Sequence, residues 1–251
     1  MKNNISKKNI ERYSRQIVLK DVGIIGQKAI LKSKVLIVGI GGLGCPIVDY
    51  LARAGVGTLG IMDFDRVNLS NIHRQSMYNS NDVGKPKVEV IKKKIKFINP
   101  YTNIKIFKKK ATNQNLNSIV KNFDIIVDGT DNFKTKFLLN KFAIKHKKSL
   151  IVGAISKFDG HIFTFNFKNE KDPCLKCFYQ SEPSDEILNC EAEGILGPVA
   201  GVVGNIQSNE VLKKILNIGK NLNGSILIIN IKNLDFRKVK FSKKKNCICK
   251  K

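Results

Sequence analysis

The chain has 251 residues, 42% of them hydrophobic, which suits one large globular domain and excludes a disordered chain. It contains neither the run of roughly 20 apolar residues that spans a membrane nor the apolar core of a secretory signal, so we expect a cytoplasmic protein with no membrane partner. The formal net charge is +25, but only six of the 45 basic residues are the Arg preferred for phosphate and base contacts, so we interpret the charge as compositional rather than as a nucleic-acid surface.

The first 155 residues alternate between strand and helix signals, after an amphipathic opening segment at about 9–32. Continuous apolar runs indicate buried parallel strands, and glycine or proline residues mark where helices begin and end. Strands are expected at 34–40, 58–65, 103–109, 123–132 and 149–155, with helices at 45–55, 86–100, 114–122 and 132–148. This alternation predicts a Rossmann-like, doubly wound and mostly parallel sheet.

After about residue 155 the pattern changes, because residues 159–167 alternate between apolar and polar side chains as in an antiparallel strand. A loop with a Cys pair follows, and then a helix at 197–216 and two closing strands at 224–230 and 233–241. The sequence therefore predicts one α/β domain with two halves. A nucleotide-binding half, about 1–155, leads into a mixed or antiparallel half, about 156–251, that binds a larger partner.

A glycine-rich turn follows the first expected strand and opens a helix. Its glycines are Gly39, Gly41, Gly42 and Gly44, in the spacing G-x-G-x-x-G. Glycine lets the backbone approach a phosphate, and the helix N-terminus offers free N–H groups. Asp63 ends the second strand, 19 residues past Gly44, where a carboxylate can accept hydrogen bonds from ribose hydroxyls. This context predicts a nucleotide site rather than a purely structural turn.

The same fingerprint is typical of NAD-dependent Rossmann oxidoreductases, which would also need a catalytic His, Lys or Tyr in the second half. Arg74 and Lys87 favour another ligand. Taken alone, Arg74 is better explained by a surface salt bridge and Lys87 by a solvated helix start. Together with the glycine loop they indicate a triphosphate, because charge must be neutralised on a leaving pyrophosphate.

Asp131 follows the fourth expected strand, within DGTDN at 128–132. Ligands bind at this carboxyl edge of parallel sheets, and a carboxylate there can share Mg²⁺ with phosphate oxygens. The alternative is that Asp131 caps the helix that follows.

Seven segments occur in order along nearly the whole chain. They are RYSRQ at 12–16, the glycine loop, DFDRVNLSNIHRQ at 63–75, VGKPKVE at 83–89, DGTDN at 128–132, CLKC at 174–177 and CEAEGILGPVAGVVG at 190–204. As a set, they resemble the ThiF/MoeB/HesA family, relatives of the ubiquitin-activating enzymes.

The resemblance implies a role for each matching residue. Gly41 and its loop neighbours would hold the phosphates of ATP, and Asp63 would bind the ribose. The residues implied around the triphosphate and its Mg²⁺ are Asn71, Arg74, Gln75, Lys87 and Asp131. In this family an Arg of the RYSRQ-type segment reaches into the partner subunit's site. Arg15 is the match, so a homodimer with shared active sites is implied.

The resemblance also implies the reaction, which is adenylylation by ATP of the C-terminal glycine carboxylate of a ubiquitin-like sulfur-carrier protein. A sulfur donor, such as a cysteine desulfurase system, would then convert the adenylate to a thiocarboxylate. The small subunit of molybdopterin synthase and the thiamine-thiazole sulfur carrier are both expected candidates, so molybdenum cofactor and thiamine biosynthesis both stay open. The remaining alternatives are activation of a tRNA, as in some relatives, and nucleotide sensing without turnover.

Cys174 and Cys177 have the C-x-x-C spacing of half a tetrahedral zinc site. The resemblance implies that a C-terminal pair completes this site. Here that pair is Cys247 and Cys249, one residue closer together than C-x-x-C. A structural Zn²⁺ on these four thiolates is our hypothesis, and a lost or weakened site is the alternative.

Two further cysteines stand apart from this set. The resemblance places Cys190 near the activated carboxylate, where it is either a nucleophile that links to the carrier or an unreactive thiol. Cys45 follows the glycine loop, and we expect it to be buried and without a catalytic role.

Overall fold

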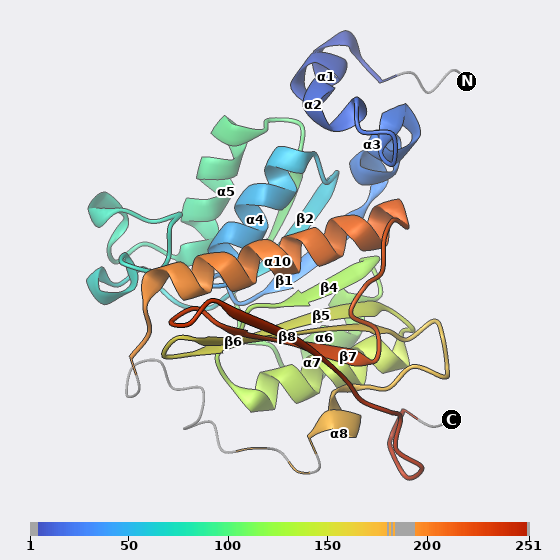
Figure 1. The fold of residues 1–251 in the computed structure, drawn as a ribbon. Helices are drawn as coiled ribbons and strands as arrows, with labels where there is room; N and C mark the ends of the chain where they lie inside the picture. The colour runs from blue at the N-terminus through green and yellow to red at the C-terminus, as the bar shows by residue number, and fades with distance from the viewer. Residues whose placement is uncertain (1–4, 180, 182, 184–193, 250–251) are drawn as a thin grey trace.

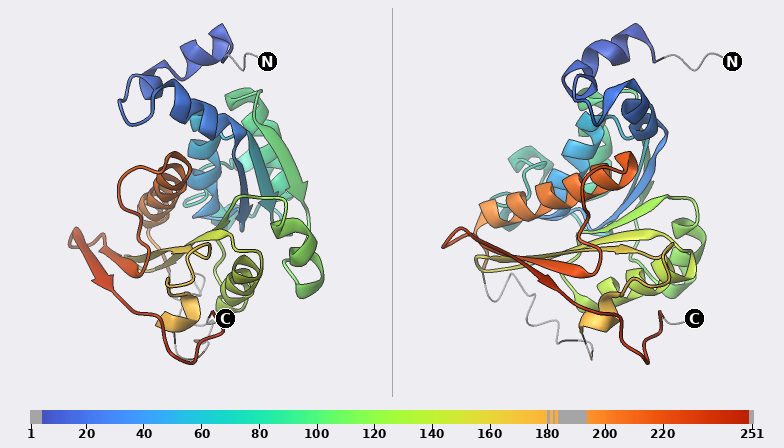
Figure 2. Two further views of the ribbon diagram at one scale, coloured as in Figure 1. Left: turned by 90° about the vertical axis from the view of Figure 1, so that its right-hand side faces the viewer. Right: turned by 45° about the vertical axis from the view of Figure 1, so that its right-hand side comes forward.

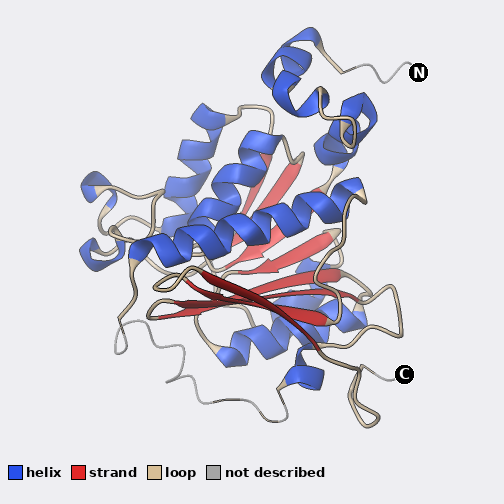
Figure 3. Ribbon diagram, in the orientation of Figure 1, coloured by secondary structure: helices blue, strands red, loops and turns tan. Residues whose placement is uncertain are grey.

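The structure is a computed structural model of the chain that describes residues 5–179, 181, 183 and 194–249. A single eight-stranded sheet runs through it, in the order β3-β2-β1-β4-β5-β6-β7-β8 (Figures 1 and 3). The strands are β1 (Lys34–Val38), β2 (Thr58–Met62), β3 (Asn103–Phe107), β4 (Ile125–Asp128), β5 (Ser149–Ser156), β6 (Asp159–Asn166), β7 (Ser225–Asn230) and β8 (Asp235–Lys240). In this order, neighbouring strands from β3 through β2, β1 and β4 to β5 pair in parallel. Neighbouring strands from β5 to β8 pair antiparallel.

Helices cover both faces of the sheet, with α4, α5 and α10 on one face and α6 and α7 on the other (Figures 1 and 2). The helices are α1 (Lys7–Arg12), α2 (Ser14–Ile17), α3 (Gly23–Lys32), α4 (Gly44–Ala54), α5 (Lys87–Ile98), α6 (Asn113–Val120), α7 (Phe133–Lys145), α8 (Leu175–Phe178) and α10 (Gly197–Leu216). Two short 3₁₀ helices, Leu69–Asn71 and Ser80–Asp82, lie between β2 and α5. This arrangement confirms the predicted α/β fold class.

Two hydrophobic cores fill the space between the sheet and its helices. In β1, Val35 and Ile37 belong to the core under α4 and α10. Their neighbours Leu36 and Val38 belong to the core under α6 and α7. Successive side chains of a strand point to opposite faces, so a strand buried on both sides must be apolar at every position. This is the physical reason for the continuous apolar run in the sequence.

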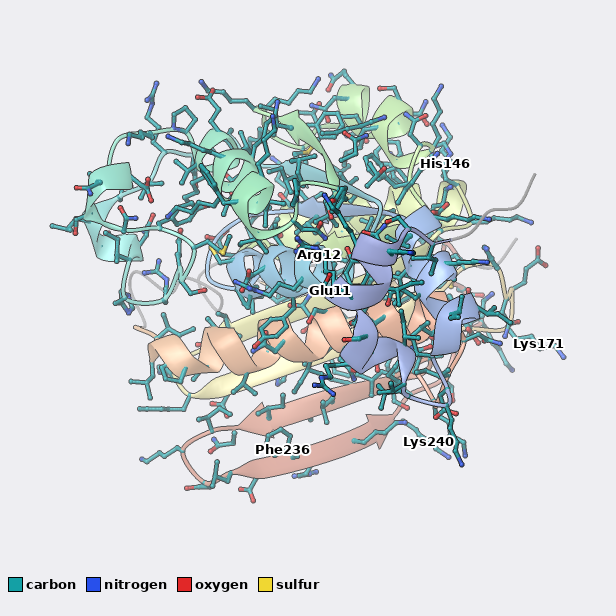
Figure 4. The ribbon with its side chains drawn as sticks, turned by 90° about the horizontal axis from the view of Figure 1, so that it is seen from above. Glu11, Arg12, His146, Lys171, Phe236 and Lys240 are labelled. Atoms are coloured by element: carbon teal, nitrogen blue, oxygen red, sulfur yellow. The ribbon has the colours of Figure 1, made fainter. Side chains whose placement is uncertain are left out.

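The N-terminal segment rests on the end of the sheet where the parallel strands begin (Figure 1). Tyr13 is fully buried, and its hydroxyl accepts a hydrogen bond of 2.8 Å from Nδ2 of Asn99. Gly55 ends α4 with φ +92°, and a Cβ atom there would lie 2.6 Å from the Tyr13 ring. Only glycine meets both conditions, which explains the helix stop found in the sequence. Seen from above, Arg12 of this segment lies near the middle of the view, and Phe236 lies on β8 at the edge of the molecule (Figure 4).

Some element boundaries differ from the predictions. The amphipathic opening segment forms three short helices, because Tyr13 leaves helical geometry to enter the core and Gly23 has φ +54°. Pro86 is the N-cap of α5 instead of its first residue. The short helix α8, which carries Cys177, was not predicted. Among the described residues, no helix is long and apolar enough to cross a membrane.

Candidate active site

A cavity opens at the carboxyl ends of the parallel strands, where α/β sheets bind their ligands. Its walls come from segments that are far apart in the sequence, and include the glycine loop, the end of β2 and the loop after β4. Among the lining residues are Gly39, Gly41, Gly42, Asp63, Phe64, Asp65, Arg74, Gln75, Lys87, Lys109, Lys110, Gly129, Thr130, Asp131 and Asn132.

The glycine loop lies directly against the loop that follows β4. Gly39 has φ +84°, and a Cβ atom on it would lie 2.8 Å from the backbone of Gly129. A Cβ atom on Gly44 would lie 2.1 Å from the carbonyl oxygen of Gly39, so this position also requires glycine. The N–H groups of Gly41 and Gly42 have no acceptor among the residues that the structure describes. Both residues line the cavity at the start of α4, so their free donors suit an anion.

Asp63 ends β2 and binds the glycine loop. Its Oδ2 accepts a hydrogen bond of 2.7 Å from the N–H of Ile40, and its Oδ1 accepts one of 2.8 Å from the N–H of Asp65. Burial raises the pKa of Asp63, and the nearby Lys87 ammonium opposes that rise. Each carboxylate oxygen can accept a further hydrogen bond, and Asp63 lines the cavity.

Two cations reach the cavity from the segment between β2 and α5. Lys87, the first residue of α5, is 5% exposed, and its Nζ lies 3.1 Å from Oδ2 of Asp65. Nη1 of Arg74 donates to the carbonyl of Ser70 at 2.9 Å and lies 2.9 Å from Nε2 of His73. These contacts hold both cations beside the glycine loop, where they can neutralise phosphate charge.

Gln75 and Asn71, which we expected beside the triphosphate, differ in their placement. Gln75 lines the cavity and is 4% exposed, and its Oε1 has no partner among the described residues. Such a buried polar atom calls for a partner that the protein itself does not supply. Asn71 does not line the cavity, and its Oδ1 instead accepts a 3.4 Å bond from the N–H of Asn68.

Asp131 lines the cavity with an exposed side chain. It does not cap the next helix, because Asn132 is the N-cap of α7 and accepts a 2.9 Å bond from the N–H of Thr135. The Asp131 carboxylate therefore stays accessible to ligands, and oxygen atoms of this kind suit Mg²⁺.

Arg15 lies on α2, is exposed and does not line this cavity. It belongs to the N-terminal segment, at the end of the sheet opposite the glycine loop (Figure 1). Within one chain, the structure thus does not bring Arg15 to the predicted site.

Two cations that line the cavity were missed by sequence reasoning. Lys109 and Lys110 follow β3 and supply two more cations, and Nζ of Lys110 lies 5.6 Å from the centre of the Phe64 ring. Their position after a strand was a usable signal. It went unused because short Lys runs occur throughout this basic chain.

Lys136 was also missed, and it organises the loop that carries Asp131. It is 1% exposed, and its Nζ donates to Oδ2 of Asp128 at 3.2 Å, to the carbonyl of Thr130 at 2.7 Å and to the carbonyl of Gly153 at 2.6 Å. One ammonium therefore ties the end of β4, the loop after it and β5 together.

A second site lies at the far side of the molecule from the N-terminal segment. The sulfur atoms of Cys174, Cys177, Cys247 and Cys249 all lie within 4.8 Å of one another. Sγ of Cys174 is 3.4 Å from Sγ of Cys247, and Sγ of Cys177 is 3.5 Å from Sγ of Cys249. The shorter C-terminal spacing therefore does not keep the two pairs apart, and the cluster can hold a metal ion.

Cys45 belongs to neither site. Cys45 is fully buried, and burial raises the pKa of its thiol to about 12, which excludes a thiolate nucleophile at neutral pH. Cys190 lies outside the described residues.

Comparison with known proteins agrees with this architecture. The family model described as ThiF family matches residues 13–251, and the chain belongs to this family. The chain is 37% identical to the sulfur carrier protein adenylyltransferase of Thermus thermophilus, over 96% of this chain and 91% of that protein. It is also 37% identical to a probable molybdopterin-synthase adenylyltransferase of Gracilaria tenuistipitata, over 97% of this chain and 68% of that protein.

Solved structures show the same fold. Escherichia coli MccB, crystallised with ATP, superposes with a TM-score of 0.81 at 22% identity, covering 99% of this chain and 75% of that one. At this identity the likeness concerns the fold alone.

Replacement of Lys136 by Met should lower the free energy of unfolding by about 3–5 kcal/mol, because the buried Asp128 carboxylate loses its counter-ion. Urea denaturation measures this loss. The matched control is Lys147→Met, which removes an exposed pair with Glu170 and should cost little. Adding Asp128→Asn to Lys136→Met should restore part of the loss. Equal stability of the two single variants would contradict a structural role for the buried pair.

Proposed function

We propose that this protein is an ATP-dependent adenylyltransferase that activates the C-terminal glycine carboxylate of a ubiquitin-like sulfur-carrier protein. The observation that carries the proposal is the meeting of three features in one cavity. These are the free N–H groups of the glycine loop, the cations Arg74 and Lys87, and the carboxylate of Asp131, which does not cap α7. The names of the relatives support the same reaction class.

The lining residues suggest how ATP is held. The N–H groups of Gly41 and Gly42 would bind phosphate oxygens, and Arg74 and Lys87 would neutralise the charge of the triphosphate. Asp63 would bind the ribose hydroxyls. The cations also disfavour NAD, whose diphosphate bridge needs less positive charge.

Asp131 would hold Mg²⁺, which screens phosphate charge when it is bound. Gln75 would accept a hydrogen bond from the nucleotide through its unpartnered Oε1. Asn71 would not touch the nucleotide. Its side chain would instead stabilise the 3₁₀ helix that precedes Arg74.

The chemical step needs little acid–base catalysis. A carboxylate oxygen of the carrier forms a bond to the α-phosphorus of ATP, and the bond from that phosphorus to the bridging oxygen of the β-phosphate breaks. The carboxylate is already ionised at neutral pH, so no proton must be removed. The products are the acyl-adenylate and pyrophosphate. Alignment and charge stabilisation by the lining residues therefore supply most of the rate enhancement.

The carrier would dock on the half of the chain after about residue 155, and its tail would enter the cavity. Sulfur at the sulfide level would come from a separate donor, such as a cysteine desulfurase system. It would form a bond to the carbonyl carbon of the acyl-adenylate, and AMP would leave as the C–O bond breaks, which gives a thiocarboxylate. A reducing cytoplasm suits the five described cysteines, which are all unpaired.

The first test is carrier-dependent ATP–pyrophosphate exchange, with the molybdopterin-type carrier and the thiamine-type carrier assayed separately. We expect exchange with one carrier, and this result would also identify the pathway.

Asp131→Ala should reduce exchange by about 10²- to 10³-fold while the fold stays intact. The control Glu89→Gln, an exposed carboxylate outside the cavity, should stay active. Unchanged exchange by Asp131→Ala would remove this residue from the mechanism, and NAD binding without ATP binding would reject the proposal.

Arg15 would act in the site of the partner subunit of a homodimer, which accounts for its absence from the cavity of its own chain. Arg15→Ala and Asp131→Ala should each be inactive alone. Mixing equal amounts and allowing the subunits to exchange should restore about a quarter of the wild-type activity, since half of the dimers then carry one complete site. If Arg15 acted within its own subunit, the mixture would stay inactive.

We propose that Zn²⁺ occupies the four-cysteine cluster as a structural ion, since four thiolates suit tetrahedral zinc. Elemental analysis should find one zinc per chain, and Cys249→Ser should lose it while Cys45→Ala retains it. Burial raises the pKa of Cys249 to about 12, so metal binding must release protons, and zinc should dissociate as the pH falls. A zinc-free chain with unchanged thermal stability would support a lost site.

A further inference from the structure

The carbonyl oxygen of Ile40, in the middle of the glycine loop, accepts a hydrogen bond from a residue that none of the proposed roles includes. The hydroxyl of Tyr78 donates to it at 2.8 Å, from 38 residues further along the chain. Tyr78 is 4% exposed, and it does not line the cavity. Sγ of Cys45 lies 3.7 Å from the same oxygen, on the buried side of the loop.

Several backbone N–H and carbonyl groups next to Ile40 form hydrogen bonds within the protein. The N–H of Ile40 donates to Asp63 at 2.7 Å. The N–H of Gly39 donates to the carbonyl of Met62 at 2.9 Å, and the carbonyl of Gly41 accepts a 3.0 Å bond from the N–H of Cys45. Within the described residues, the N–H groups of Gly41 and Gly42 have no acceptor, and the same holds for those of Leu43 and Gly44 where the loop enters α4.

The geometry of the peptide unit links Tyr78 to one of these free donors. The carbonyl of Ile40 and the N–H of Gly41 belong to the same unit, which is planar and trans, so they point in opposite directions. Tyr78 holds the carbonyl toward the hydrophobic core, and the N–H of Gly41 therefore points away from the core. Gly41 lines the cavity, so this N–H faces the space where an anion would lie.

The orientation of the Ile40–Gly41 peptide unit depends on a hydrogen bond to fix it, because the backbone beside a glycine rotates easily. A half-turn of the Ile40–Gly41 unit would place a carbonyl oxygen where the N–H now stands, and that oxygen would repel a phosphate. Gly41 has no Cβ atom to oppose the rotation, and it adopts many backbone conformations. The Tyr78 hydrogen bond is lost in the rotated arrangement, so it stabilises the anion-binding one.

We infer that Tyr78 is a positioning residue for phosphate binding, whose hydroxyl fixes the Ile40–Gly41 peptide with its N–H directed at the phosphate chain. The inference rests on the proposed function, because it takes a nucleoside triphosphate as the ligand. It adds a residue that touches neither the nucleotide nor the carrier.

The test is Tyr78→Phe, which removes one oxygen atom and keeps the ring in the core. We expect the Kd of ATP to rise about tenfold, the effect of one charge-assisted hydrogen bond. The Kd of adenosine should not change, because adenosine has no phosphate. The Kd of inorganic tripolyphosphate, which has neither base nor ribose, should rise by the same factor as the Kd of ATP. Calorimetric titration of the full chain measures the Kd of ATP and of tripolyphosphate, and NMR titration measures the Kd of adenosine.

A matched control separates phosphate orientation from a general loss of stability. The buried hydroxyl of Ser33 donates to the carbonyl of Ile30 at 2.7 Å, just before β1 and at the end of that strand far from the cavity. Ser33→Ala thus removes the same kind of hydrogen bond, and it should lower the urea midpoint without changing any Kd. In the wild-type chain, tripolyphosphate should also shift the amide resonance of Gly41, a measurement that needs no variant.

Each outcome decides something. Equal weakening of ATP and adenosine in Tyr78→Phe, unchanged ATP binding, or an unmoved Gly41 resonance would overturn the inference. If the wild-type chain bound tripolyphosphate but not ATP, the proposed function would fail while the role of Tyr78 could still be established. Binding of neither probe by the wild-type chain would overturn both.

Discussion

The close approach of two backbone segments sets the geometry of the whole site. A Cβ atom on either Gly39 or Gly129 would lie 2.8 Å from backbone atoms of the other segment, so the loops after β1 and β4 touch without side chains between them. The N–H of Gly129 also donates to the carbonyl of Val38 at 2.8 Å. Gly41 and Asp131 each follow this contact by two residues, and they therefore enter the same cavity. Because neither Gly39 nor Gly129 carries a Cβ atom, the free N–H of Gly41 and the carboxylate of Asp131 come together in one cavity, as the proposed function requires.

The cations reach the site by a different route, which explains the long segment between β2 and α5. This segment forms two 3₁₀ helices instead of a direct crossover, and it folds back over the end of the sheet. The first 3₁₀ helix precedes Arg74 and Gln75, and the segment ends at Lys87, the first residue of α5. Within one folded unit, the glycine loop and the cations Arg74 and Lys87 therefore reach one cavity from separate segments, and the 3₁₀ helices of the second segment have their own capping boxes.

The sequence predicted what depends on local pattern, and missed what depends on long-range contact. The bounds of α10, 197–216, were predicted to the residue because Pro198 marks its start and apolar residues continue to Leu216. The family-like motifs led to most of the predicted site residues in the cavity, but Arg15, Gly44 and Asn71 do not line it, and Cys190 lies outside the described residues. Lys136 could not be singled out, because nothing local separates a buried Lys from the many solvated ones. Its importance arises from three oxygen acceptors on three segments.

Strand β5 has a consequence for how the site can exclude water. It pairs with β4 on the parallel side and with β6 along its whole length on the antiparallel side, and Ala154 and Ile155 reach the cavity wall. Enzymes that close over their substrates by domain motion bend at a hinge between two separate units. Here the sheet is continuous across the boundary between the halves, so no hinge of that kind is available. Under the proposed function, the bound partner and loops outside the sheet would therefore provide the cover that shields the reactive anhydride from hydrolysis.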